Sequence, residues 1–275
     1  MLTIMVALHC EAKPIIDTYR LKKVCSKPFD HYMSNANEEL AIELVVTGIG
    51  ALAMATAVGW VGAATNVAQR IWLNLGTAGH ATRELGELVL IHGVGDEVLQ
   101  RSHYPSLVAK WSGATDAVLS VSAPCTEYPG GAAVDMEAYA FFNSALRFSN
   151  SEAVQSMKVI SDNQESGIEH LNAARLTGLI AANLDSIKGY IDALGLIVLP
   201  SFKVSFELDR IFQLRGTYSQ RQQVRELLQM LQVMGRLESI SDKLFNCDSL
   251  KEALVILRAE HSLTVPSLSE VEING

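Results

Sequence analysis

Short apolar runs alternate with helical patterns along most of the chain. The strand-like runs occupy Thr3 to Leu8, Ala41 to Thr47, Ile71 to Leu75, Leu88 to His92, Val118 to Val121 and Lys158 to Ser161. Apolar positions at helical spacing predict helices over Lys13 to Tyr19, Ala51 to Gln69, Met136 to Phe148 and Ile168 to Leu194. This alternation predicts an α/β layer fold with a largely parallel sheet.

The pattern changes after Leu199-Pro200, where Gln, Leu, Arg and Glu dominate and glycine becomes rare. Apolar residues at helical spacing recur in Tyr218 to Met234 and again in Leu250 to Leu257. We therefore expect two domains, an α/β domain over residues 1–199 and a helical C-terminal appendage over residues 200–275. The appendage is predicted to hold three or four amphipathic segments between Ser201 and His261, with a frayed tail after Leu263. We interpret it as a packing cap or a dimer surface without chemistry of its own.

Composition and charge exclude several classes of function. Hydrophobic residues make up 49% of the chain and charged residues 19%, which indicates a folded protein with elements buried on both faces. The net charge is −8 and there is no run of basic residues, so a nucleic-acid partner is not expected. The four cysteines form no CxxC pair and the histidines show no metal-ligand spacing, so we expect no metal site and a reducing, cytoplasmic location.

Two apolar segments need a separate interpretation. Met1 to Cys10 lacks a positively charged start and a cleavage site, so it is predicted to be a first strand and not a secretion signal. Leu44 to Gln69 carries no charge and is long enough to span a bilayer. However, Gly48-Ile49-Gly50 interrupts it, and its composition is that of a strand, a turn and a close-packed helix. No membrane partner is expected.

Two glycine-rich turns are predicted after strands. Thr47-Gly48-Ile49-Gly50 approaches the dinucleotide-binding fingerprint, which also requires an acid at the end of the next strand. That position carries Asn74, so NAD and FAD are disfavoured, whereas an anion or a ribose against the amides near Gly50 fits. The second turn, Asn74 to Gly79, would add a wall to a cleft at the carboxyl edge of the sheet.

Three acids stand at the ends of apolar runs or beside them: Glu11, Glu137 and Asp162. Each one alone is typical of a helix cap or a solvated charge. Together they matter more, because carboxylates that follow parallel strands converge on one rim of the sheet. That rim is where acid/base chemistry is built.

Six motifs in order, from about residue 3 to about residue 195, resemble the nucleoside phosphorylase/nucleosidase superfamily. The similarity is greatest to its hydrolytic branch, typified by methylthioadenosine/S-adenosylhomocysteine nucleosidase, futalosine hydrolase and the hopanoid-pathway nucleosidase. The motifs are Ala7-Leu8-His9-Cys10-Glu11, Thr47-Gly48-Ile49-Gly50, Asn74-Leu75-Gly76-Thr77-Ala78-Gly79, Leu85-Gly86-Glu87-Leu88-Val89, Val134-Asp135-Met136-Glu137 and Ile160-Ser161-Asp162. The resemblance implies three αβα layers around a central mixed, largely parallel twisted sheet. It also implies hydrolysis of the N-glycosidic bond of a purine nucleoside, without cofactor or metal, by a homodimer.

The resemblance also assigns roles to individual residues. Glu11 matches the carboxylate that activates water, and Asp162 the acid that protonates the purine at N7. Met136 and Glu137 match the residues that pack the sugar and bind its hydroxyls. Tyr128, on a loop before Asp135, is the candidate for stacking on the base. The full set of expected substrate-binding residues is Gly50, Thr77, Ala78, Gly79, Tyr128, Asp135, Met136, Glu137 and Ser161.

Departures from the family leave alternatives open. The phosphorylase branch clamps phosphate with arginine where this chain has Asn74, which favours water as nucleophile. Arg83 or Lys158 could replace that clamp, although Lys158 matches a basic residue beside the water-activating acid of nucleosidases. A phosphate-dependent phosphorylase and a non-catalytic nucleoside-binding protein are therefore the two alternatives. The base stays open, because the stretch from Glu87 to Asp135 is short, and the 5′ substituent stays open, because no 5′ pocket can be mapped.

Overall fold

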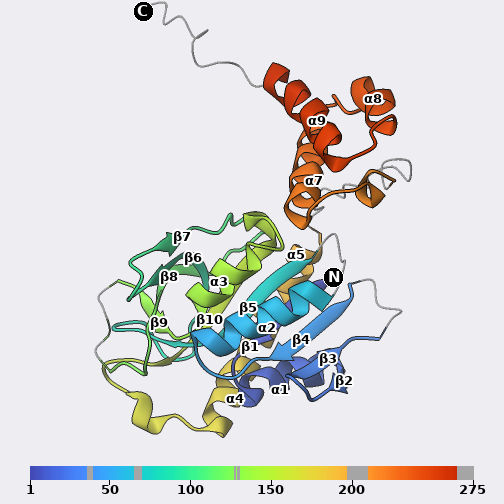
Figure 1. Ribbon diagram of the computed structural model, residues 1–275. Helices are drawn as coiled ribbons and strands as arrows, with labels where there is room; N and C mark the ends of the chain where they lie inside the picture. The colour runs from blue at the N-terminus through green and yellow to red at the C-terminus, as the bar shows by residue number, and fades with distance from the viewer. Residues whose placement is uncertain (36–39, 65–69, 127, 129–130, 197–209, 265–275) are drawn as a thin grey trace, which may run out of the picture. The chain divides into compact units, whose positions relative to one another are not determined.

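The structure is a computed structural model that describes residues 1–35, 40–64, 70–126, 128, 131–196 and 210–264 (Figure 1). The chain divides into two compact units, Met1–Leu199 and Pro200–Gly275. Each unit has its own hydrophobic core. We therefore describe the two units one at a time.

The larger unit is a mixed α/β structure. Its described strands form a ten-stranded sheet: β1 Leu2–Val6, β2 Lys22–Cys25, β3 Asp30–Met33, β4 Ile42–Val46, β5 Ile71–Gly79, β6 Leu88–Asp96, β7 Ser102–His103, β8 Ala114–Ser120, β9 Ala133–Asp135 and β10 Val154–Asp162. Its helices are α1 His9–Thr18, α2 Ala51–Ala64, α3 Ala138–Ala145, α4 Ala173–Ala182 and α5 Leu184–Gly195, with short 3₁₀ turns at Ser151–Ala153 and Ile168–His170. The expected α/β fold is confirmed.

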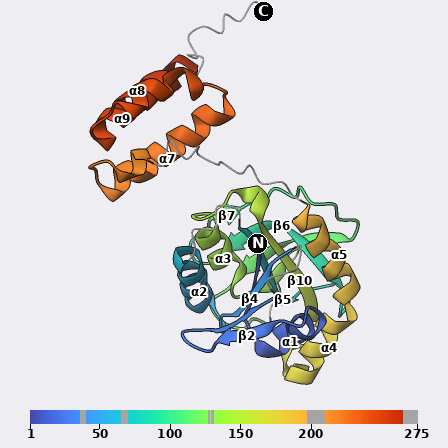
Figure 2. The same ribbon diagram turned by 90° about the vertical axis from the view of Figure 1, so that its right-hand side faces the viewer.

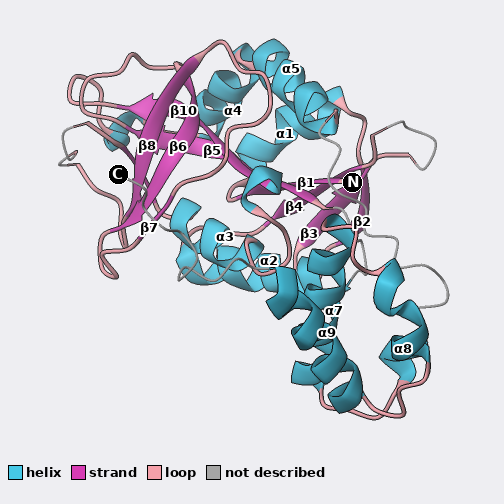
Figure 3. Cartoon of the chain, turned by 90° about the horizontal axis from the view of Figure 1, so that it is seen from above, coloured by secondary structure: helices cyan, strands magenta, loops and turns pink. Residues whose placement is uncertain are grey.

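Helices cover both faces of the sheet, with α1, α4 and α5 on one side and α2 and α3 on the other (Figure 3). Strand β1 shows why: all five of its residues are buried, and they alternate between the two cores. Leu2, Ile4 and Val6 belong to the core under α1, α4 and α5, while Met5 belongs to the core under α2 and α3. A continuous apolar run is the signature of a strand buried on both faces.

The sheet is parallel at its centre and closes on itself at one side, a closure that the sequence did not indicate. Strands β4, β1, β5 and β10 run parallel, and β2 and β3 add an antiparallel edge. From β10 the sheet continues through β6, β8 and β9, and β9 returns to β5. Irregular register in β6 and β10 bends both strands, which favours this closure. The three-layer description therefore needs a closed, barrel-like portion in addition.

Several predicted elements differ from the structure. Asn74 to Gly79 is the second half of strand β5 and not a turn, because its backbone continues to pair with β10. The single helix expected over Ile168 to Leu194 is a 3₁₀ turn and two α-helices, which meet at Asn183. The side-chain amide of Asn183 donates to the carbonyl oxygens of Gly86 and Leu179 and stabilises this break.

Other differences concern the ends of elements. Helix α1 begins at His9, four residues before the predicted start, so Glu11 lies in its first turn. Helix α3 begins at Ala138, after the predicted Met136. The end predicted for the second helix, at Gln69, lies outside the described residues. Strands β2, β3, β7 and β9 are short or partly exposed and were not predicted.

The smaller unit is helical in its described part. It consists of α7 Tyr218–Val233, α8 Ser241–Phe245 and α9 Leu250–Thr264, with 3₁₀ turns at Arg210–Gln213 and Glu238–Ile240 (Figure 2). The residues at helical spacing form its core, with Val224, Leu228 and Leu231 of α7 against Leu250, Leu254 and Leu257 of α9. The beginning of the predicted appendage and most of the predicted tail lie outside the described residues. None of the helices in the described part of the whole chain is long and apolar enough to cross a bilayer.

Candidate active site

A cavity of about 180 Å³ lies at the carboxyl ends of the parallel strands β1, β5 and β10. The residues that line it come from both ends of the larger unit's sequence, as expected when parallel strands end at one rim. They are Ala7, Leu8, Glu11, Ile49, Thr77, Ala78, Gly79, Val121, Pro124, Cys125, Tyr128, Val134, Asp135, Met136, Glu137, Ser161, Asp162, Ile168, Leu171 and Leu176. Both predicted catalytic residues and eight of the nine predicted binding residues, all but Gly50, lie here.

Glu11 is held in the first turn of α1 by donors from two strands' ends. Its Oε1 accepts hydrogen bonds from the Thr77 backbone N–H (2.8 Å) and hydroxyl (2.6 Å), and its Oε2 accepts one from the Leu8 N–H (3.1 Å). A Cβ at position 76 would lie 3.4 Å from Oε1, so Gly76 leaves room for the carboxylate. Burial raises the pKa of Glu11, and the Thr77 bonds offset only part of that rise. Glu11 is therefore a fixed carboxylate with increased affinity for a proton.

Glu137 binds the backbone of the first glycine turn, Thr47 to Gly50. It precedes α3, and its Oε1 accepts a hydrogen bond of 2.6 Å from the backbone N–H of Gly50. Gly50 has a positive φ of 97°, which glycine adopts without strain. The amide expected to receive an anion or a ribose is thus occupied by a carboxylate of the chain itself. Burial raises the pKa of Glu137, and the charge of Asp135 adds to the effect.

Lys158 and Asp135 form a buried ion pair beside these acids. Lys158 Nζ lies 2.8 Å from Asp135 Oδ2, and Asp135 also accepts hydrogen bonds from the Ser120 hydroxyl (2.6 Å) and the Ala138 N–H (2.8 Å). Burial alone would lower the pKa of Lys158, but Asp135, Glu137 and Glu11 together raise it. Asp135 therefore lies in the cavity wall with its carboxylate held by the protein, and it anchors the start of α3.

Asp162 ends strand β10 with a hydroxyl on each carboxylate oxygen. The Tyr128 hydroxyl donates to Oδ2 at 2.7 Å, and the Ser161 hydroxyl donates to Oδ1. Burial raises the pKa of Tyr128, and its bond to Asp162 raises it further. A Cβ at position 79 would lie 2.5 Å from both Asp162 Oδ2 and Tyr128 Cε1, so only glycine fits there. Tyr128, the residue predicted to stack on a base, is bonded to the acid in this structure.

The lining also includes residues that the sequence did not single out. Leu8 and Ile49 lie within the recognised motifs, just after strands β1 and β4, and that position was the available signal. Ile168, Leu171 and Leu176 belong to a segment that was predicted to be one long helix. The helical pattern of this segment did not show its break points.

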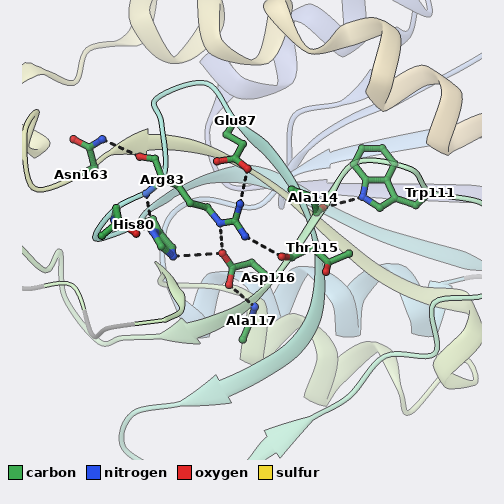
Figure 4. A network of polar contacts seen from close by, with 10 residues as sticks. His80, Arg83, Glu87, Trp111, Ala114, Thr115, Asp116, Ala117 and Asn163 are labelled. Atoms are coloured by element: carbon green, nitrogen blue, oxygen red, sulfur yellow. Dashed lines mark hydrogen bonds and ion pairs between the residues drawn. The ribbon is translucent and has the colours of Figure 1, made fainter.

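Arg83, considered as a phosphate clamp, belongs to a polar network outside the cavity lining (Figure 4). Its guanidinium donates to Asp116, Glu87 and the Thr115 carbonyl oxygen. Desolvation opposes the charge, but the two carboxylates raise the pKa of Arg83. The Arg83 guanidinium is therefore already paired with two carboxylates.

The same network supports the loop that follows Asp162. The Asn163 side chain donates to the Arg83 carbonyl oxygen and accepts from the N–H groups of Glu165 and Ser166. Asn163 thus caps a turn. The backbone N–H of His80 donates to the Asp162 carbonyl oxygen at 3.0 Å. The end of β10 is consequently fixed from both sides.

Asn74, at the position of the missing phosphate-binding arginine, is buried in the middle of β5. Its side-chain amide donates to the Met5 carbonyl oxygen (3.3 Å) and accepts from the Ser156 hydroxyl (3.1 Å). It contributes a cross-link between strands and no charge.

Comparisons with solved structures place this architecture among known folds. A variant of the nucleosidase MTAN from Chlamydia trachomatis matches with 18% identity and a TM-score of 0.56, covering 70% of this chain and 98% of that one. The 5′-methylthioadenosine nucleosidase of Arabidopsis thaliana matches with 15% identity and a TM-score of 0.56, covering 71% and 96%. The futalosine hydrolase of Helicobacter pylori matches with 13% identity and a TM-score of 0.57, covering 70% and 97%.

The chain has the nucleosidase fold. This agrees with the resemblance to the nucleoside phosphorylase/nucleosidase superfamily, at the level of the fold. No protein-family model and no curated protein sequence matches the chain. Five of the six motifs that carried the sequence resemblance contribute residues to the cavity lining, and the motif from Leu85 to Val89 does not.

Proposed function

We propose that the protein hydrolyses the N-glycosidic bond of a purine nucleoside and releases the free base and the ribose moiety. The observation that carries this proposal is the joint placement of Glu11, Glu137 and Asp162 on one cavity of the nucleosidase fold. Each carboxylate comes from a different element and is held by its own hydrogen-bond donors. Cleavage of a glycosidic bond needs carboxylates of this kind in separate roles.

In the proposed reaction Asp162, in its protonated form, gives its proton to N7 of the base. The bond between C1′ and N9 then breaks with both electrons going to the base, and the sugar becomes an oxocarbenium-like cation. Glu137 accepts hydrogen bonds from the ribose hydroxyls and stabilises the developing positive charge. Glu11 takes one proton from a water molecule whose oxygen bonds to C1′. Its increased proton affinity suits it to this step.

Water is a better nucleophile than phosphate for this cavity. Among the described residues that line it there is no arginine or lysine. Arg83 is bound to two carboxylates, and Asn74 is neutral and buried. A phosphate dianion would therefore enter beside four acids, and Lys158, which lies among three of them, is already paired with Asp135. The phosphorylase alternative lacks its essential interaction.

The non-catalytic alternative is disfavoured by the energetics of Glu11. Burial opposes its charged form, so the protein keeps a carboxylate at the expense of stability. A protein that only binds a nucleoside does not need such a group in a fixed position. Catalysis needs a carboxylate in a fixed position, because proton transfer depends on its distance from the reacting atoms.

The oligomeric state and the location belong to the same proposal. We propose a homodimer, because α2 carries no charge along its length and exposes Leu52 at 86%. We propose a cytoplasmic location, because the cysteine pattern of the sequence favours a reducing compartment. Sedimentation of the purified protein tests the dimer, and a monomer at micromolar concentration would contradict it.

The deciding experiment is chromatographic detection of free base. The purified protein is incubated with adenosine, inosine, methylthioadenosine, S-adenosylhomocysteine or 5′-deoxyadenosine, each with and without phosphate. We expect release of the base without phosphate, and none from the matched variant Asp162→Asn. Release only with phosphate would establish the phosphorylase. Binding detected by thermal shift without any release would establish the binding protein.

A further inference from the structure

Tyr128 lies directly against the proposed acid, Asp162, in the cavity. Its phenol ring packs on Gly79, where a Cβ would lie 2.5 Å from Cε1, and its hydroxyl donates to Asp162 Oδ2. The other carboxylate oxygen, Oδ1, is held by Ser161. In this state both oxygens of the proposed acid already have a donor.

A purine that takes a proton from Asp162 needs the position that the Tyr128 ring occupies. It is a flat aromatic ring with one polar atom at the carboxylate, and it has to lie against the end of strand β5. The Tyr128 phenol is also a flat aromatic ring, bonded to Asp162 and seated on the last residue of β5. The remaining route to Asp162 through Oδ1 is closed by the neighbouring Ser161.

We propose that Tyr128 fills the base subsite of the ligand-free protein and that the purine displaces it from Asp162 on binding. Tyr128 is then a latch on the acid and not a stacking platform that waits for the base. The identification of the displacing ligand as a purine rests on the proposed function. The bond to a carboxylate is charge-assisted, so breaking it weakens the apparent affinity for the base.

The test measures binding and turnover separately. Adenine and hypoxanthine binding is measured by calorimetry on the wild type, on Tyr128→Phe and on a control, Tyr104→Phe, whose tyrosine is 77% exposed. Tyr128→Phe keeps the ring and removes the bond, so we expect base affinity to rise on the order of tenfold. The control should bind like the wild type. In turnover, KM should fall by a similar factor.

The outcomes separate this inference from the proposed function. Hydrolysis with an unchanged or higher KM in Tyr128→Phe would keep the function and overturn the latch, as would a lower kcat at unchanged KM. No hydrolysis, but tighter adenine binding by Tyr128→Phe, would overturn the function and keep the latch. Equal base binding by wild type and variant, or none by either, would overturn the latch. Tyr128→Ala should bind adenine at least as tightly as the wild type, and weaker binding would identify a stacking platform instead.

Discussion

The two ends of the parallel strands bury carboxylates in opposite electrostatic conditions. At the carboxyl ends, burial raises the pKa of Glu11 and of Glu137. Near the amino ends of β1, β4 and β5, burial alone would also raise the pKa of Glu43, but His31 and Arg70 lower it to about 2. Glu43 Oε1 lies 2.9 Å from the His31 ring, and Oε2 accepts from Arg70.

The difference separates a structural cluster from a reactive one. Glu43 also accepts a hydrogen bond of 2.7 Å from Thr3, so its charge is satisfied and its affinity for protons is low. At the other end a single lysine, Lys158, lies among Asp135, Glu137 and Glu11, and its 2.8 Å partner is Asp135. Acids whose charge is poorly compensated have a raised affinity for protons, which is the property that proton transfer uses.

The largest expected effect is the loss of catalysis at the carboxyl end. Glu11→Gln should lower kcat about 1000-fold, because the group that takes the proton from water is removed. The unfolding free energy at pH 7 should not fall and should rise by about 1 kcal/mol, since a buried charge disappears. Activity assays and denaturant unfolding measure the two quantities. Asp17→Asn, at an exposed position of the same helix, is the control. Loss of folding in Glu11→Gln would make Glu11 structural.

Asp162→Asn should lower purine release by a similar factor while the fold is kept. The amide still occupies the space on Gly79, but it cannot give a proton to the base. Circular dichroism and thermal melting check the fold, and chromatography measures the base. Unchanged turnover would remove Asp162 from the role of acid.

At the amino end the same kind of substitution should have the opposite outcome. Glu43→Gln should lower the unfolding free energy by about 3 kcal/mol, because Arg70 and His31 lose their buried partner. Its kcat should stay unchanged at a temperature where the variant is folded. Because the folded-state pKa of Glu43 is lowered, its contribution is complete above its ordinary value near 4.5 and is lost as the pH falls toward about 2. A stable Glu43→Gln would remove the contrast between the two ends.

Gly79→Ala should lower kcat by about 10- to 100-fold and the unfolding free energy by about 2 kcal/mol. The added Cβ would lie 2.5 Å from Asp162 Oδ2 and has to displace it. Gly93→Ala is the matched control on strand β6, because its Cβ would meet neighbours at 3.5 Å or more, which is ordinary contact. Equal effects of both substitutions would show that Gly79 is needed only for the strand.

The smallest expected effect is a displacement of the pH profile. Hydrolysis requires ionised Glu11, and burial raises its pKa above the ordinary 4.5. The acidic limb of kcat/KM should therefore lie above pH 4.5, with activity falling as the pH decreases through it. The sign for stability is the reverse: protonation of Glu11 favours the folded state, so its unfavourable contribution disappears at lower pH. A limb at or below pH 4.5 would contradict the contrast with Glu43.

The chain's own sequence determined the strands whose burial is continuous and the acids that follow them. The run from Leu2 to Val6 has no polar position but Thr3, so local pattern alone predicts a strand between two helical layers. Glu11 and Asp162 follow such runs, and parallel strands bring their ends to one rim. The glycines of Thr47 to Gly50 likewise mark a turn, because two of them adopt a positive φ.

Only the tertiary structure decided how these parts are used. Asn74 to Gly79 looks like a glycine turn, yet pairing with β10 across more than 80 residues makes it a strand. Tyr128 meets Asp162, and Lys158 meets Asp135, through contacts between elements far apart in sequence. The physical reason is that a local pattern specifies which faces are buried, whereas the partners of a buried charge depend on the closure of the whole sheet.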